Sequence, residues 1–115
     1  MAFCCSCAFA GLEPSPALKN TYAVKSSLHN AFWGADLLLK EHKSPSCENY
    51  YVTNVAPSNY ERFQSNGVWY SKWTEYWTIQ ACSDEIVIKY DFFQSDNDES
   101  TCKPKVISKN GKPIN

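Results

Sequence analysis

A single glutamate interrupts a row of aromatic residues near the middle of the chain. Glu75 stands between Trp73 and Trp77, and strand alternation with a period of two residues places all three side chains on one face. A carboxyl group buried between indole rings would suit a general acid or a contact to a ligand. No second carboxylate is spaced to partner it in acid–base chemistry. We therefore favour an edge position at which Glu75 reaches solvent or pairs with a lysine, with the catalytic role as the alternative.

The same segment resembles a platform on which a carbohydrate or a peptide could stack, because it carries Trp69, Tyr70, Trp73, Tyr76 and Trp77. Aromatic residues are also common in strands, where they fill the cores of small sheets. The alternation assigns the tryptophan face to the core and leaves Tyr70 and Tyr76 on the opposite face. The predicted binding surface comprises Tyr70, Tyr76 and Glu75.

The six cysteines fall into two groups. The first is a C-C-x-C cluster at residues 4–7, which lacks the second half that a zinc site requires. The second group comprises Cys47, Cys82 and Cys102. In an oxidising compartment, three thiols suggest one disulfide and one cysteine left over. We favour Cys47–Cys82, which would close a loop of about 35 residues; a Cys82–Cys102 bond across a hairpin and three reduced thiols are the alternatives.

Two further groups of candidate metal ligands fail on spacing. The acidic segment 95–101 begins like a calcium-binding loop, but its sixth position is Thr101 rather than glycine and its twelfth is Ile107 rather than glutamate. A solvated turn is the better interpretation. His29 and His42 lie on different faces of a predicted helix, so they do not form a joint metal site. No metal and no cofactor are therefore expected.

The overall composition places these residues in one small folded domain. The chain has 115 residues, a net charge of −1, and four Trp, seven Tyr and six Phe. That length is typical of a single domain, and so many aromatic residues can dominate its core. The near balance of charges leaves no basic excess to attract a phosphate backbone, which argues against nucleic-acid binding. No apolar run reaches the roughly 20 residues of a transmembrane helix.

The N-terminal residues resemble the end of an export signal. Residues 1–10 carry no charge and close with Ala8-Phe9-Ala10, the A-x-A pattern that signal peptidase reads. The apolar stretch is short and no basic residues precede it, so we interpret it as a truncated signal. We expect cleavage after Ala10, a single domain over residues 11–115, and a periplasmic or envelope location. A lipid anchor at Cys7 is a weaker alternative, because the preceding residues make a poor lipobox.

Periodicity predicts one helix followed by strands. Apolar residues recur at helical spacing from Val24 to Leu39, which indicates a helix over residues 18–42 that stops at Ser44-Pro45. Strands are expected at residues 49–56, 60–64, 68–82, 85–92 and 105–108. One helix followed by a run of strands indicates an α+β fold, with the N-terminal helix packed on a four- or five-stranded antiparallel meander sheet.

The strand motif also resembles a known group of sequences. The stretch from Trp73 through Glu75 and Trp77 to Cys82 is similar to the W-x-E-x-W-x-V-x-x-C-G pattern of a family of small uncharacterised bacterial exported proteins, often described as lipoproteins. The cysteine at Cys47 matches one that follows the family's helix. The chain departs from the pattern with Ser83 in place of a glycine, and with an acidic rather than glycine-rich turn. The resemblance covers residues 30–108; it implies an envelope location and a Cys47–Cys82 disulfide, and no activity.

The sequence therefore predicts an exported, non-enzymatic binding or interaction module of the bacterial envelope, which uses the outer face of its sheet or an edge strand. Its partner would be an unknown protein or envelope component, with no nucleic acid and no transmembrane span. One alternative is a secreted inhibitor or effector whose loop near residues 95–101 docks in the cleft of a partner enzyme. The other is a small enzyme built around Glu75 or Cys102, although no third group is evident to orient a nucleophilic cysteine.

Overall fold

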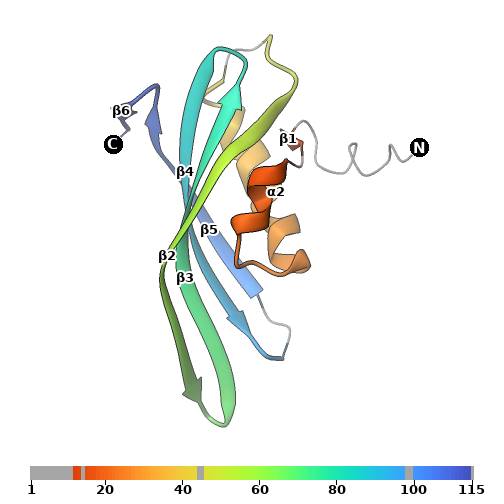
Figure 1. The fold of residues 1–115 in the computed structure, drawn as a ribbon, viewed down its shortest axis with the longest axis vertical. Coiled ribbons are helices and arrows are strands. Elements are labelled where there is room, and N and C mark those ends of the chain that lie inside the picture. Colours follow the sequence, from red (N-terminus) through yellow and green to blue (C-terminus); the bar gives the residue numbers. More distant parts are fainter. Residues whose placement is uncertain (1–11, 14, 44–45, 98–99, 115) are drawn as a thin grey trace, which may run out of the picture.

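An antiparallel sheet backed on one face by a helical layer makes up the fold (Figure 1). The structure, a computed structural model, describes residues 12–13, 15–43, 46–97 and 100–114. The signal-like segment 1–10, Ser44-Pro45 and residues 98–99 of the acidic segment lie outside the described residues. The predicted α+β class is confirmed.

Six strands follow one another across the sheet in the order of the chain. The first, β1 (Leu12–Glu13), pairs parallel with the start of the second. All later neighbours pair antiparallel, and they are β2 (Tyr50–Ser65), β3 (Val68–Ala81), β4 (Asp84–Ser95), β5 (Ser100–Lys109) and β6 (Lys112–Pro113). The predicted antiparallel meander is therefore confirmed, with the unpredicted two-residue strands β1 and β6 added at its two edges. β5 is longer than the predicted 105–108, because pairing with β4 continues back to Ser100.

β2 corrects the prediction of two short strands at residues 49–56 and 60–64. The segment Pro57–Asn59 does not end the strand; the pairing with β3 shifts register between Ser58 and Glu61 instead. At this irregularity Asn59 has a φ of 56°, in the left-handed region that asparagine tolerates better than most residues. The shift has the character of a β-bulge, which absorbs extra residues and bends a strand without ending it.

The helical layer also differs from the predicted helix over residues 18–42. A 3-10 helix, η1, covers Pro16–Asn20, and an α-helix, α2, covers Lys25–Leu39. Between them, Thr21 and Tyr22 leave the helical path, and both donate hydrogen bonds to the buried side chain of Glu75. Helix propensity amounts to less than about 1 kcal/mol per residue, so hydrogen bonds to a buried charged group outweigh it.

The core forms where α2 meets the middle of the sheet. The helix buries Ala31, Phe32, Ala35 and Leu39, all members of its predicted apolar stripe. The ring of Phe32 meets the fully buried Trp77 edge to face, with centroids 5.8 Å apart. At Gly34 the helix comes close to β5, since a Cβ atom there would lie 2.8 Å from the Pro104 side chain.

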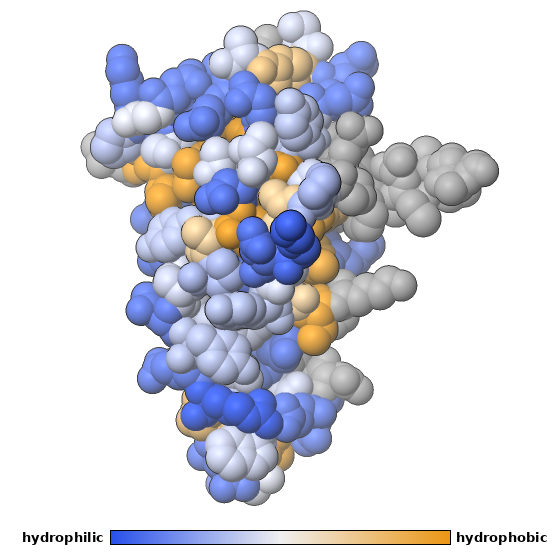
Figure 2. Space-filling model, viewed as in Figure 1, coloured by the Kyte–Doolittle hydropathy of each residue, from blue (hydrophilic) through white to orange (hydrophobic). Residues whose placement is uncertain are grey.

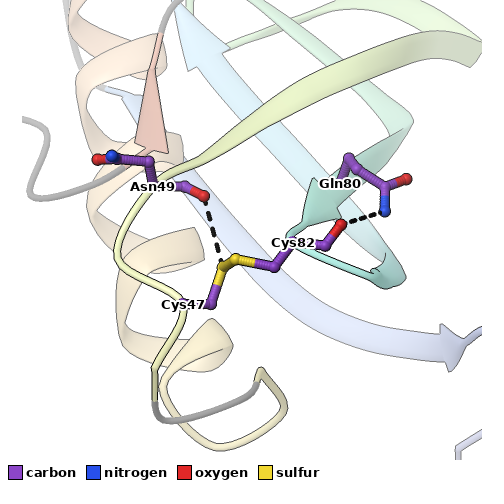
Figure 3. Close-up of a disulfide and its surroundings, with 4 residues drawn as sticks. All are labelled: Cys47, Asn49, Gln80 and Cys82. Atoms are coloured by element: carbon purple, nitrogen blue, oxygen red, sulfur yellow. Dashed lines mark hydrogen bonds between the residues drawn. A yellow bond between two sulfur atoms is a disulfide. The ribbon is translucent and has the colours of Figure 1, made fainter.

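The favoured disulfide is confirmed near the β3–β4 turn (Figure 3). Cys47 and Cys82 are bonded, with their Cα atoms 5.8 Å apart. The Gln80 Nε2 atom donates a hydrogen bond of 2.7 Å to the carbonyl oxygen of Cys82 beside the bond. The disulfide ties the segment after α2 to the end of β3, and Cys102 is the free cysteine of the described part of the chain.

The strands extend well beyond the helix. With 15 residues, α2 is about 22 Å long, whereas β3, with 14 residues, is about 45 Å long. The end of the β2–β3 hairpin therefore projects past the helical layer (Figure 1). In the view of Figure 2, strongly hydrophobic residues gather in the upper half, and the lower half over the hairpin is mostly blue or pale. We call the region under α2 the covered half and residues 60–72 the arm.

Candidate functional site

Glu75 lies within an interior strand and is completely buried. Its Oε1 atom accepts hydrogen bonds from the Thr21 hydroxyl and from Trp77 Nε1, both at 2.8 Å. Its Oε2 atom accepts from Trp73 Nε1 at 2.7 Å, and from the Tyr22 backbone N–H and the Thr21 hydroxyl at 2.9 Å. The favoured edge position, with contact to solvent or a lysine, is therefore wrong. Glu75 does not belong to an exposed binding surface either.

The partners of Glu75 explain why a carboxylate stands among tryptophans. Each partner is a donor, and together they occupy the lone pairs that a carboxylate offers. The indole N–H groups of Trp73 and Trp77 would lack these acceptors without it, which is costly in a core. A general acid needs access to a substrate, and a completely buried, fully bonded carboxylate has none. We call Glu75 with Thr21, Tyr22, Trp73 and Trp77 the Glu75 clamp, since it fixes the η1–α2 connection onto β3.

Beside the clamp, three aromatic side chains are exposed towards the arm. Tyr22, Tyr60 and Trp69 are 53%, 50% and 43% exposed. Tyr22 meets Tyr60 edge to face with ring centroids 5.6 Å apart, and Tyr60 lies against the buried Trp73 at 5.7 Å. Tyr22 and Tyr60 line a hollow of about 430 Å³. We call this surface the arm face; it consists of Tyr22, Tyr60, Arg62, Trp69 and Asp96, with the buried Ser71 beneath them.

A polar network joins the two ends of the arm face. Arg62 forms a bidentate ion pair with Asp96, with Nη2–Oδ2 and Nη1–Oδ1 distances of 2.7 Å and 3.3 Å. The hydrogen bond to Asp96 raises the pKa of the Arg62 guanidinium. The same guanidinium lies 5.2 Å from the ring centroid of Trp69, within the range of a cation–π contact. The Ser71 hydroxyl accepts hydrogen bonds from the Tyr60 hydroxyl and Arg62 Nη1, so the network orients both rings.

The predicted surface at Tyr70 and Tyr76 lies on the opposite face of the sheet, where both side chains are half-buried. Tyr70 packs against Phe63 and Phe93, with ring centroids 5.5 Å and 5.2 Å away. Tyr76 is six residues further along β3, or about 20 Å. The two tyrosines are therefore far apart on the outer face, and Glu75 lies on the other face of the sheet. The three residues do not form one surface.

A second hollow of about 430 Å³ opens on this outer face, with Glu61, Lys72, Asp91 and Lys103 in its lining. Lys72 and Glu61 already pair with each other, their Nζ and Oε2 atoms 3.4 Å apart. Asp91 and Lys103 occupy directly opposed positions of β4 and β5. Its four charged residues are thus two acids and two bases, and Trp73, Phe92 and Phe93 also belong to the lining, although Trp73 and Phe92 are buried.

Cys102 lacks the features of a catalytic nucleophile. Burial raises the pKa of its thiol to about 11, so little reactive thiolate exists at neutral pH.

In the described part of the chain, no three His, Cys, Asp or Glu side chains are grouped so that they could hold a metal ion. None of the described helices is long and apolar enough to cross a membrane.

The strand pattern predicts Trp69 in the core, which is wrong, and it does not mark Tyr22, Tyr60 or Arg62 as surface residues. One signal was present: Trp69 follows the Asn66-Gly67 turn almost directly, at the strand end furthest from the predicted helix. No comparable signal marks Tyr22, because its position depends on the clamp to a glutamate far along the chain.

Comparisons with known proteins add no family assignment. A scan against protein-family models, a search of curated proteins and a search of solved structures each found no match to this chain. The resemblance to small exported proteins stays a prediction. The arm face, supported by the Glu75 clamp, is the candidate functional site.

Proposed function

We propose that the protein is an exported, non-enzymatic binding module of the cell envelope, and that the arm face is its ligand-binding surface. The observation that carries this proposal is the exposure of Tyr22, Tyr60 and Trp69, which the Arg62 network connects, with Tyr22 and Tyr60 lining a hollow. Exposed patches of apolar side chains on a folded protein often mark the sites at which it binds a partner or a ligand. Tyr, Trp and Arg are also the residues enriched at the energetic centres of interfaces.

Rigid support strengthens the case for binding. Tyr22 is held through its own backbone N–H by Glu75, and Trp69 lies under a guanidinium that is fixed by Asp96. Side chains that are ordered before a ligand arrives lose less conformational entropy when it binds. The arm face is therefore prepared for contact in a way that scattered surface aromatic residues are not.

Two further features support a non-enzymatic, exported protein. The carboxylate of Glu75 is occupied by hydrogen-bond donors, among them Trp73 and Trp77. Burial raises the pKa of Cys102, so its side chain stays a thiol. The Cys47–Cys82 disulfide suits an oxidising compartment, and Ala8-Phe9-Ala10 fits signal-peptidase cleavage.

Co-sedimentation tests the binding proposal. The oxidised protein is incubated with the insoluble envelope fraction of the source organism, and the pelleted protein is measured for the wild type, Trp69→Ala and Trp33→Ala. Trp33 is a matched control, since it is 58% exposed but lies on α2. We expect the wild type and Trp33→Ala to pellet alike and Trp69→Ala to remain in solution.

Two results would overturn the proposal. The first is a wild-type protein that does not pellet with the envelope fraction, and the second is equal retention of Trp69→Ala and wild type. Retention that is lost in Tyr70→Ala but kept in Trp69→Ala would move the binding surface to the outer face of the sheet. Recovery of uncleaved, fully reduced protein from the cytosol of the source organism would reject export.

A further inference from the structure

We infer that the ligand of the arm face is a neutral oligosaccharide. This inference rests on the proposed binding function and adds the chemical class of the ligand. Its basis is the combination of exposed aromatic rings, a charge-balanced polar network and a face longer than a single ring.

The exposed rings offer the apolar part of the site. Tyr60 and Trp69 lie on the helix-side face of the sheet, Tyr22 of the η1–α2 connection packs against Tyr60, and all three side chains are exposed. An aromatic ring has a negative face that attracts partly positive groups, and the C–H groups on one side of a sugar ring are such groups. A sugar stacked on an aromatic ring also removes apolar area from water on both sides.

The charges of the arm face indicate that the ligand is neutral. Within the arm face as defined, the charged groups are Arg62 and Asp96, and they neutralise each other through two hydrogen bonds. An anionic ligand would have to compete with Asp96 for the guanidinium, and a cationic ligand would have to compete with Arg62 for the carboxylate. A neutral ligand leaves the Arg62–Asp96 ion pair intact and hydrogen-bonds to the donor and acceptor positions that the pair itself does not use.

That remaining capacity favours hydroxyl groups over a proline-rich peptide, the other ligand that docks on exposed aromatic rings. The Arg62 and Asp96 side chains are 44% and 54% exposed, so a guanidinium donor and a carboxylate acceptor stand next to each other at the surface. A sugar hydroxyl both donates and accepts, and neighbouring hydroxyls can satisfy both groups at once. Proline residues have no N–H to give to the carboxylate.

The length of the arm face suggests a chain of sugars rather than a single sugar. Trp69 and Trp73, against which Tyr60 lies, are separated by four residues of β3, or about 13 Å. The exposed Arg62 guanidinium occupies the interval between them, above the buried Ser71 hydroxyl to which it donates a hydrogen bond. Because Trp73 is buried, the two stacking positions are Trp69 and Tyr60. Separated by a polar interval, they match an oligosaccharide that stacks on a ring at each end and hydrogen-bonds to Arg62 in the middle.

Direct binding measurements test this inference. The oxidised protein is titrated with soluble neutral oligosaccharides (β-1,4-linked glucose, α-1,4-linked glucose and β-1,4-linked N-acetylglucosamine), with an oligogalacturonate as the anionic probe and with a proline-rich peptide. Tryptophan fluorescence and calorimetry report binding. We expect saturable binding of at least one neutral oligosaccharide, and weaker or no binding of the oligogalacturonate and the peptide.

Variants assign the binding to the arm face. Trp69→Ala and Tyr60→Ala should each weaken binding about tenfold or more, and Arg62→Lys should weaken it because lysine cannot make the bidentate pair. Trp33→Ala should bind as the wild type does. Trp69→Phe retains a ring and should recover part of the affinity, which separates loss of stacking from loss of folding.

The outcomes separate this inference from the proposed function. If no neutral oligosaccharide binds while retention on the envelope fraction still depends on Trp69, the saccharide assignment fails and the binding module stands. Preferred binding of the proline-rich peptide or the oligogalacturonate would also overturn the assignment. If envelope retention is absent as well, both proposals fail.

Discussion

Trp77 and Trp69 occupy the same face of the same strand, yet their surroundings differ completely. Trp77 is fully buried beneath Phe32 of α2, whereas Trp69 is 43% exposed on the arm. The strand pattern treats them alike, and only the reach of the helix distinguishes them. One alternating sequence thus supplies the core in the covered half and a candidate binding surface on the arm.

The difference shows where polar side chains are needed. In the covered half, the aromatic rings are held by close packing and by Glu75 buried among them. On the arm, the corresponding role falls to the exposed pair Arg62–Asp96, which orients Trp69 without burying it. Exposed ion pairs contribute little to stability, so the arm network is better suited to positioning side chains than to stabilising the fold.

The largest expected contrast is between Trp77→Ala and Trp69→Ala. Loss of the buried indole should lower the free energy of unfolding by about 3–5 kcal/mol, whereas loss of the exposed one should change it by less than about 1 kcal/mol. Urea denaturation measures both. Trp77→Phe is a milder companion, in case the alanine variant does not fold. Equal effects at the two positions would contradict the division into a covered half and an arm.

Removal of the disulfide should come next. The double variant Cys47→Ala/Cys82→Ala opens a loop with a sequence separation of 35 residues, and loop-closure entropy makes this worth roughly 3–4 kcal/mol. Ligand binding at the arm face should be retained under conditions where the variant is folded, because the bond lies at the other end of β3. Cys102→Ala serves as the thiol control. A double variant that kept wild-type stability but no longer bound the ligand would contradict the assignment of the disulfide to stability and of the arm face to binding.

Replacement of Glu75 should affect both regions at once. Glu75→Gln exchanges one acceptor oxygen for an NH₂ donor that faces other donors, so at least one buried group loses its partner. The expected cost is about 1–3 kcal/mol, together with weaker ligand binding, because the Tyr22 backbone N–H is among the donors that must share the one remaining acceptor oxygen. Glu61→Gln is the matched control, since Glu61 is exposed and pairs with the exposed Lys72, and it should change stability by less than about 0.5 kcal/mol. If Glu75→Gln had wild-type stability and wild-type ligand binding, the Glu75 clamp would support neither the core nor the arm face.

Alkaline pH should weaken the covered half through Tyr90. Burial raises the pKa of Tyr90 well above its usual value, with further contributions from Cys102 and Glu75, and its hydroxyl donates to the Ala31 carbonyl oxygen at 2.7 Å. Because the unfolded phenol ionises near pH 10, this contribution is complete below that pH and declines above it, by about 1.4 kcal/mol per pH unit. Thermal unfolding between pH 9 and pH 11 checks this. If a Tyr90→Phe variant lost stability with rising pH as steeply as the wild type, the loss would belong to other titrating groups.

The parts of the fold that the sequence analysis anticipated depend on local patterns. Alternation in 68–82 correctly paired the faces of β3, and the Asn66-Gly67 turn has the positive φ angles of 51° and 80° that a tight hairpin requires. Errors occurred where two signals conflicted. At Pro57–Asn59, turn residues suggested a break, but the pairing of β2 with β3 on both sides of the bulge kept one strand.

The candidate site could be anticipated only in part. The sequence alone determined that Glu75, Trp69, Trp73 and Trp77 share a face, because side-chain direction in a strand depends only on position. It also favoured Cys47 and Cys82 as disulfide partners. The tertiary structure decided which of those side chains are covered, because α2 is shorter than the strands it packs against.

The role of Glu75 was likewise decided only by the tertiary structure. Its hydrogen bond to Thr21 joins residues 54 positions apart, and no local pattern reports a contact at such a separation. The residue that first suggested catalysis is a structural anchor, and the tryptophan assigned to the core is part of the candidate binding surface. In both cases the side chain's direction followed from the strand, while its environment depended on which distant segment packed against it.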